Sequence, residues 1–271
     1  MTIDEIKEKA KRVRRQVIRM AHEGKTSHVG SALSCVDILA VLYLNVLNCT
    51  VNNWQKPEAS RFILSKGHAA KALYAVLAEA GFISMEDLSS YAKDGTAYGE
   101  HPSHKGVPGI SVSTGSLGHG LAIGAGQALA KKLDGRQGHV FVLLSDGECN
   151  EGSIWEAAMC ASAQKLDNLI VIIDDNHMQA MGPSRAISGL DPLADKWKAF
   201  GWNVKECDGH DVKDLIESCT GFLKGNGRPS VIVARTVLGK GVSFMEDKIL
   251  WHYQIPSAQD MSIAFKELDV S

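Results

Sequence analysis

The sequence lacks the patterns that mark several classes of protein. Its six cysteines form no C-x-x-C pair and no zinc-ligand spacing, so free thiols in a reducing cytoplasm are expected. No apolar signal-peptide segment follows the basic N-terminus. The longest apolar run, residues 36–47, is interrupted by Asp37 and Asn45 and is too short to cross a bilayer. A cytoplasmic protein without a membrane partner is predicted.

An excess of charge of one sign is also missing. The 271 residues carry a formal net charge of -2 and the pI is near 6.5, so no broad basic field would draw the chain to nucleic acid. No G-x-x-x-x-G-K-[ST] phosphate loop is present, and the glycines between Gly118 and Gly126 form a loose series that close helix packing also explains. Small molecules and proteins are the expected partners.

What the sequence does contain is an alternation of short β-branched runs with helical stretches. Such runs are typical of buried parallel strands, and 45% apolar residues can fill one large core. We predict a single α/β domain over residues 1–271, with a doubly wound, mostly parallel sheet and helices on both faces. The predicted strands are 61–64, 140–144, 169–173, 203–206 and 230–236. The predicted helices are 3–22, 35–47, 69–80, 117–133, 153–164, 190–200 and 212–224, with a short helix or frayed tail from about Asp260.

Two neighbouring strand ends offer oxygen ligands. Residues 145–148 (S-D-G-E) follow one predicted strand, and residues 174–176 (D-D-N) follow the next. Open α/β sheets bind ligands outside the carboxyl ends of their strands. Magnesium prefers oxygen ligands and often takes only one or two from the protein, with phosphate oxygens and water completing the shell. Either motif alone can be an ordinary turn, but together they predict a magnesium-bridged diphosphate.

Four histidines lie in separate predicted loops, at His28, His68, His101 and His252. Histidine donates and accepts hydrogen bonds and titrates near neutrality, so several around a sugar can orient hydroxyls and move protons. A single histidine is more often structural, and we interpret the remaining ones so, with the role of His119 left open: His22, His104, His139, His177 and His210.

Over about residues 22–252 the chain resembles the transketolase family. The run S-D-G-E-C-N-E-G, a helix and N-L-I-V-I-I-D-D-N are similar to the family's thiamine diphosphate signature. Residues 26–31, 64–69 and 99–102 resemble its three histidine loops, and residues 240–252 its last histidine segment. Residues 113–120 resemble the glycine turn that receives the cofactor's diphosphate and aminopyrimidine. Ser27, His119 and Ser145 depart from the residues common there.

The resemblance implies a thiamine diphosphate-binding fold and a set of site residues. Asp146, Asn176 and the carbonyl of Met178 are the expected ligands of magnesium, for which calcium or manganese can substitute. Cofactor contacts are expected from His68, Gly115, Ser116, Leu117, Ser145, Asp146, Gly147, Glu148, Asn176, Ala180 and His252. Catalytic roles are expected for His28, His68, His101 and His252, and for Glu151, which would communicate with the neighbouring site.

The resemblance also implies half of an enzyme. In this family the diphosphate and the pyrimidine are held by two domains, and the sequence ends at Ser271, just beyond the first. We therefore expect the N-terminal subunit of a split transketolase. A separate C-terminal subunit would carry the pyrimidine-binding domain, in a heterotetramer of two plus two chains. The chain alone is expected to be inactive.

The expected reaction moves a two-carbon ketol (glycolaldehyde) unit from a ketose to an aldose, usually sugar phosphates. A branched-sugar phosphate or a sulfosugar is also admissible as donor. Half of another thiamine diphosphate enzyme, such as a 2-oxo-acid dehydrogenase, would share the metal motif but would not need the spaced histidines. A non-catalytic paralogue is disfavoured because the expected ligands and all four histidines are present.

Overall fold

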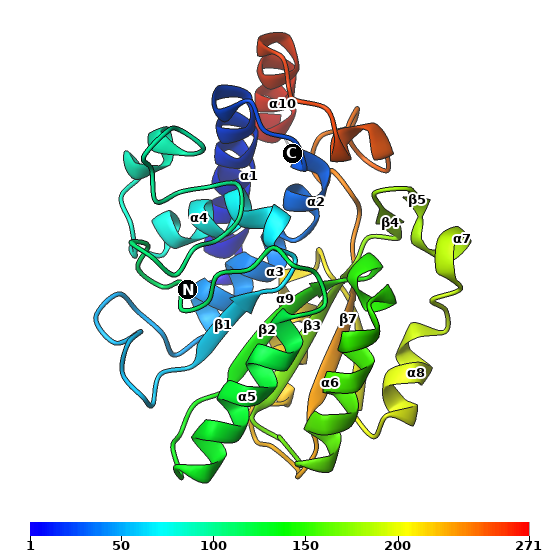
Figure 1. The fold of residues 1–271 in the computed structure, drawn as a ribbon. Coiled ribbons are helices and arrows are strands. Elements are labelled where there is room, and N and C mark those ends of the chain that lie inside the picture. Colours follow the sequence, from blue (N-terminus) through cyan, green and yellow to red (C-terminus); the bar gives the residue numbers. More distant parts are fainter. Residues whose placement is uncertain (271) are drawn as a thin grey trace.

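A parallel five-stranded sheet forms the centre of the structure, a computed structural model that describes residues 1–270 (Figure 1). Its strands, in order across the sheet, are β1 (Arg61–Leu64), β2 (Val140–Ser145), β3 (Leu169–Asp175), β7 (Ser230–Arg235) and β6 (Asn203–Asp208). All neighbouring pairs are parallel. β2 and β3 are buried along their whole length, which is why their sequences are continuous apolar runs as far as Leu144 and Ile173.

Helices cover both faces of this sheet, which confirms the predicted doubly wound fold. The helices are α1 (Ile3–Gly24), α2 (Val29–Ser34), α3 (Val36–Val41), α4 (Ala70–Glu79), α5 (Gly120–Leu133), α6 (Gly152–Ala163), α7 (Ser184–Ser188), α8 (Leu193–Ala199), α9 (Val212–Gly221) and α10 (Ala258–Val270). α5 and α6 lie over one face of β2 and β3, and α3 and α9 lie behind them (Figure 1). Alternate residues of β2 enter different cores, Phe141 and Leu143 one and Val142 and Leu144 the other.

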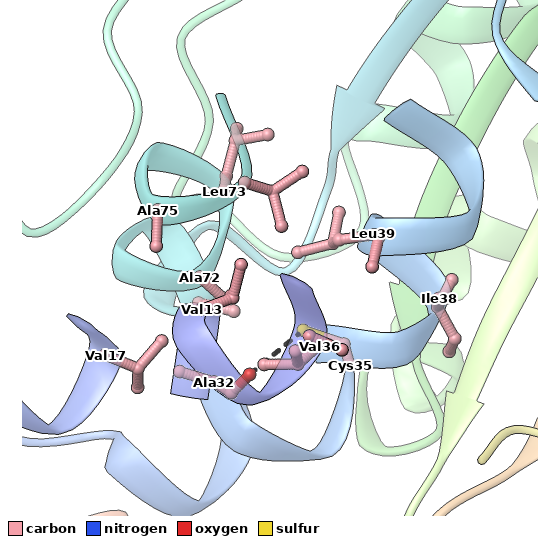
Figure 2. Packing of buried hydrophobic residues seen from close by; sticks show 14 of the residues in the cluster. Val13, Val17, Ala32, Cys35, Val36, Ile38, Leu39, Ala72, Leu73 and Ala75 are labelled. Carbon is pink, nitrogen blue, oxygen red and sulfur yellow. Dashed lines mark hydrogen bonds between the residues drawn. The ribbon is translucent and has the colours of Figure 1, made fainter. Parts of the chain in front are cut away.

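The core on the α1 side supports the loops that follow α1 and β1. Figure 2 shows how its small and branched side chains interlock between α1, α2, α3 and α4. Val13 and Val17, one turn apart on α1, face this core and are fully buried. The labelled neighbours are Ala32, Cys35, Val36, Ile38, Leu39, Ala72, Leu73 and Ala75. The segments that carry His28 and His68 therefore start from a rigid base.

All predicted strands and helices are present, with shifted ends. The helix expected from Leu117 begins at Gly120, and residues 42–46 continue α3 as a π-helical turn. The prediction missed α2, α7 and the hairpin of β4 (Met178–Gln179) and β5 (Gly182–Pro183), because such short segments show no period. Of the two forms expected near Asp260, the helix is correct: α10 packs on α1.

Residues 92–119 contain neither helix nor strand, as the lack of a hydrophobic period predicted. All six cysteines are free thiols. Within residues 1–270, none of the helices combines the length and apolar character needed to cross a membrane.

Candidate functional site

A cleft of about 320 Å³ lies at the carboxyl ends of β1, β2 and β3. Most of the predicted site residues line it: His28, His68, His101, Gly115, Leu117, Ser145, Gly147, Glu148, Glu151, Met178, Ala180 and His252. Three predicted residues do not. Ser116 is exposed, whereas Asp146 and Asn176 are buried at the same strand ends. The lining residues that the sequence did not suggest are Ser31, Asn150 and Gln179.

The predicted histidines, which come from separate loops, meet at this cleft. The ring centroid of His28 lies 5.3 Å from that of His68 and 4.8 Å from that of His252. His101 lies against Gly115, where an added Cβ would be 3.0 Å from the His101 ring. Burial lowers the pKa of His28 to about 4, and it also lowers the pKa of His68 and His252, with neighbouring positive charges adding to the effect. These three rings are therefore neutral at pH 7 and can both donate and accept hydrogen bonds.

Hydrogen bonds fix the orientation of these rings. The Ser27 hydroxyl lies 3.0 Å from His28 Nδ1, and the Ser31 hydroxyl lies 2.8 Å from His68 Nε2. The His28 backbone N–H donates to the His252 carbonyl at 2.9 Å, which joins the first histidine loop to the last. His28 has a φ of 62°, a left-handed conformation at the residue before α2, and it lines the cleft.

Glycines allow the second histidine loop and the 113–120 turn to touch. A Cβ on Gly67 would lie 2.8 Å from the Gly115 nitrogen, so no larger residue fits there without moving the backbone. Glu148 holds this turn in place, since its buried carboxylate accepts from the Gly118 N–H at 2.9 Å and from the Ser65 hydroxyl. Glu148 thus ties the 113–120 turn to the segment that follows β1.

Asp146 is buried beside the cleft, and the pKa of its carboxyl group is strongly raised. It is completely buried, and neither of its carboxylate oxygens forms a hydrogen bond of good geometry among the described residues. Burial raises its pKa to about 7 against the opposing effect of the Ser184 hydroxyl and the Gly147 N–H, and the charges of Asp175 and Asp174 add to the rise. Because an unpaired buried carboxylate is costly, native proteins normally give it a cation or a donor. The site therefore fits a hard cation such as magnesium.

The neighbouring Asp174, by contrast, is fully neutralised. Its carboxylate contacts the ammonium of Lys66, with both side chains completely buried, and accepts from the Ser34 hydroxyl at 2.6 Å. It also accepts from the Asn176 amide at 3.3 Å, which leaves the Asn176 oxygen to face the Met178 N–H at 3.1 Å. The sequence placed Asp174 among the strand-end oxygen ligands but did not predict its pairing with Lys66. The available signal was a lysine at the end of an apolar strand, in L-S-K-G-H.

A second possible ligand set overlaps with the predicted one. Asp146, Asp175 and His177 offer ligand atoms that all lie within 4.8 Å of one another. His177 was expected to be structural or solvent-facing, and its Nδ1 in fact lies 3.0 Å from Asp175 Oδ1. Since Asp175 and His177 already pair with each other, Asp146 is the member that still needs a partner.

Comparison with known proteins shows the family of the chain that carries this cleft. A family model described as the transketolase thiamine diphosphate binding domain matches residues 6–261. The chain belongs to the transketolase family. The sequence resemblance is thereby confirmed, and the matched region contains all four clustered histidines and both strand-end motifs.

The chain matches relatives of similar length, and it also matches part of longer transketolases whose structures are solved. One subunit of an apulose-4-phosphate transketolase from Actinobacillus succinogenes is 40% identical, over 99% of this chain and 97% of that protein. One subunit of a 6-deoxy-6-sulfo-D-fructose transketolase from a Clostridium species is 39% identical, over 89% and 88%. The transketolase structure of Campylobacter jejuni superposes with a TM-score of 0.91 at 27% identity over 99% of this chain. This chain spans only 43% of the length of that transketolase.

Proposed function

We propose that this chain is the diphosphate-binding subunit of a two-chain transketolase, which transfers a two-carbon ketol unit from a ketose to an aldose. The observation that carries the proposal is the cleft lined by neutral histidines, together with the buried Asp146 at the same strand ends. Relatives named as transketolase subunits, matched over almost their whole length, support the division into two chains. A 2-oxo-acid enzyme would not require this group of hydroxyl-binding rings.

The cofactor end of the site would be built on the two strand ends. Thiamine diphosphate, when bound, supplies the nucleophilic carbon that takes up the two-carbon unit. Asp146, Asn176 and the Met178 carbonyl would hold magnesium, and calcium or manganese could use the same oxygens. We prefer this set to the one with His177, because magnesium favours oxygen over imidazole. The glycine turn and residues Ser145 and Gly147 would lie along the diphosphate.

The substrate end would be built from the histidines. His28, His68 and His252, being neutral, would bind sugar hydroxyls as donors and acceptors, and His101 would complete the group next to Gly115. The same rings can pass protons to and from sugar oxygens. Glu151 is exposed beside the glycine turn, where a Cβ on Gly118 would lie 2.7 Å from its own Cβ, and it would contact the neighbouring chain.

The assembly we propose is a cytoplasmic heterotetramer of two such chains and two C-terminal subunits, each supplying a pyrimidine-binding domain. The relatives' names point to two different donors, a branched-sugar phosphate and a sulfosugar. Groups that recognise the far end of the sugar would lie mainly on the partner, so either donor is compatible with this cleft.

The decisive test mixes the chain with its candidate partner, thiamine diphosphate, magnesium and a panel of ketose and aldose phosphates and sulfosugars. Product formation is followed by mass spectrometry. We expect turnover only when both chains are present, because the reactive pyrimidine end needs groups from the partner. Full turnover by this chain alone would disprove the two-chain arrangement, and turnover of a 2-oxo acid instead of a ketose would disprove the reaction.

His101→Ala is expected to lower kcat of the assembled enzyme by about a hundredfold or more, the contribution typical of a proton-transferring group. Thiamine diphosphate binding should be retained, because the expected magnesium ligands Asp146, Asn176 and Met178 are unchanged. His104→Ala is the matched control: His104 lies in the same loop, is exposed and bonds only Ser113 among the described residues. Equal rates for both variants would remove His101 from the reaction.

A further inference from the structure

Helix α4 carries two buried polar residues close to the histidine cluster, Lys71 and Tyr74. His68 lies immediately before it, and Lys71 and Tyr74 follow at three-residue spacing, so all three share one side of the segment. Lys71 is 1% exposed, and its ammonium donates to the Ser27 carbonyl at 2.7 Å. Tyr74 is fully buried, and its hydroxyl donates to the His101 carbonyl at 3.3 Å.

Each of these two bonds ends in a different histidine loop. Ser27 directly precedes His28, and the Ser27 hydroxyl is the group that contacts the His28 ring. His101 is itself the residue whose carbonyl Tyr74 holds. We propose that Lys71 and Tyr74 are positioning residues, which fix the loops of His28 and His101 relative to His68. The inference rests on the proposed function, because it assigns these bonds to the histidine group that would bind the sugar.

A structural role alone does not explain a lysine at position 71. A fully buried ammonium costs free energy, and an apolar side chain of similar volume usually stabilises such a position equally or better. Burial lowers the pKa of Lys71 to about 8, with Glu100 opposing the shift, so the group is mostly charged at pH 7. The free-energy cost of burying the Lys71 ammonium therefore persists at neutral pH.

The charge of Lys71 acts on the same rings that its hydrogen bond positions. Burial is the main reason for the lowered pKa of His28, and the neighbouring His252, Lys71, His101 and Lys66 add to it. Lys71 contributes in the same direction to the pKa of His68 and His252. The other groups that face Lys71 are Glu100 and the ring of Tyr91, 5.8 Å from its nitrogen. The lysine thus helps to keep the histidines uncharged.

The first experiment is an NMR titration of the histidine rings in the full chain, which requires neither substrate nor turnover. Lys71→Met removes the charge and keeps the length of the side chain, so the titration midpoints of His28 and His252 should rise by a few tenths of a pH unit. Lys71→Arg should keep them low. The control is Lys131→Met, which removes another buried lysine. Among the described residues it donates only to loop carbonyls away from the cleft, those of Pro57, Ala59 and Gln137.

The second experiment measures the enzyme assembled with its partner. Lys71→Met should lower kcat by up to about a hundredfold, the effect of a small misplacement of reacting groups, while thiamine diphosphate binding is unchanged. Tyr74→Phe removes one hydroxyl and little packing. It should shift the His101 ring resonance without moving the midpoints of His28 and His252.

Unchanged histidine midpoints in Lys71→Met, or an equal change in Lys131→Met, would overturn the inference. If Lys71→Met does not fold, an unaltered His101 resonance and kcat in Tyr74→Phe would do so. Shifted histidines in a complex that transfers no ketol unit would instead refute the proposed function and retain the positioning bonds. The two failures are therefore distinguishable.

Discussion

Asp146→Asn is expected to abolish magnesium-dependent binding of thiamine diphosphate in the assembled enzyme and, at the same time, to stabilise the metal-free chain. Both effects follow from the two unpaired oxygens of a completely buried carboxylate. Asparagine is nearly isosteric but carries no charge, so it neither binds the cation well nor incurs the cost of burying a charge without a partner.

The stabilisation by Asp146→Asn should depend on pH and should be largest above pH 7. Burial raises the Asp146 pKa from 3.8 to about 7, and each pKa unit corresponds to about 1.4 kcal/mol, so the gain above pH 7 should be on the order of 4 kcal/mol. A raised carboxyl pKa means that ionisation opposes folding. The gain should therefore be full above pH 7 and should diminish as the pH falls toward 4.

Calorimetric titration of thiamine diphosphate with and without magnesium measures the binding, and thermal unfolding of the metal-free chain at pH 5 and 8 measures the stability. Asp94→Asn, at an exposed position outside the cleft, controls for the loss of a carboxylate. Asp175→Asn separates the two ligand sets, and a complete loss of binding there would favour the set with His177. Undiminished metal-dependent binding in Asp146→Asn would exclude Asp146 as a ligand.

Arg14→Met should destabilise the chain by about 3–5 kcal/mol, the usual cost of leaving a buried charge without its partner. Arg14 forms a two-bond pair with the buried Asp37, at 3.0 and 2.5 Å, and also donates to the Lys240 carbonyl. His210 completes the network: its Nε2 accepts from the Val237 N–H at 2.9 Å, so its Nδ1 carries the proton and donates to Asp37 at 2.7 Å.

The pH dependence of this network has the opposite sign to that of Asp146. Burial alone would raise the Asp37 pKa, but Arg14 and His210 outweigh it and bring the pKa down from 3.8 to about 2. The carboxylate therefore stabilises the fold above pH 4, and this contribution is lost as the pH falls toward 2. Urea unfolding of wild type and Arg14→Met at pH 3 and 7 should show a smaller difference at pH 3.

A surface pair provides the control for this variant. Arg12 pairs with Glu79 but is largely exposed, so Arg12→Met should cost no more than about 1 kcal/mol. Arg14→Met with Asp37→Asn should recover part of the lost stability, because no buried charge is then left alone. A double variant as unstable as Arg14→Met would show that the cost comes from lost packing. The network also holds residues 237–241, where the Gly239 N–H donates to the Gly30 carbonyl behind the His28 loop.

The strands, the helices and the location of the site could be predicted because each depends on a pattern of neighbouring residues in the sequence. β2 and β3 are apolar up to Leu144 and Ile173, since both faces of the sheet are covered, and that alone predicts parallel strands with helices on two sides. Parallel strands end at one edge, which brings the motifs around Asp146 and Asn176 together without further information. The histidine loops were recognisable by resemblance to the family.

Which charged groups neutralise one another was decided only by the tertiary structure. Asp174 and Asp146 look alike in sequence, yet Lys66, 108 positions from Asp174, neutralises the first and leaves the second free. In the same way Lys71 looks like a surface residue of a helix in the sequence, yet it is buried and its ammonium donates to the Ser27 carbonyl. Burial patterns repeat along the chain and can be read from it, whereas charge pairing depends on which distant segments meet. The sequence by itself determined the fold and the position of the cleft, and the packing of separate loops determined the charge of each group within it.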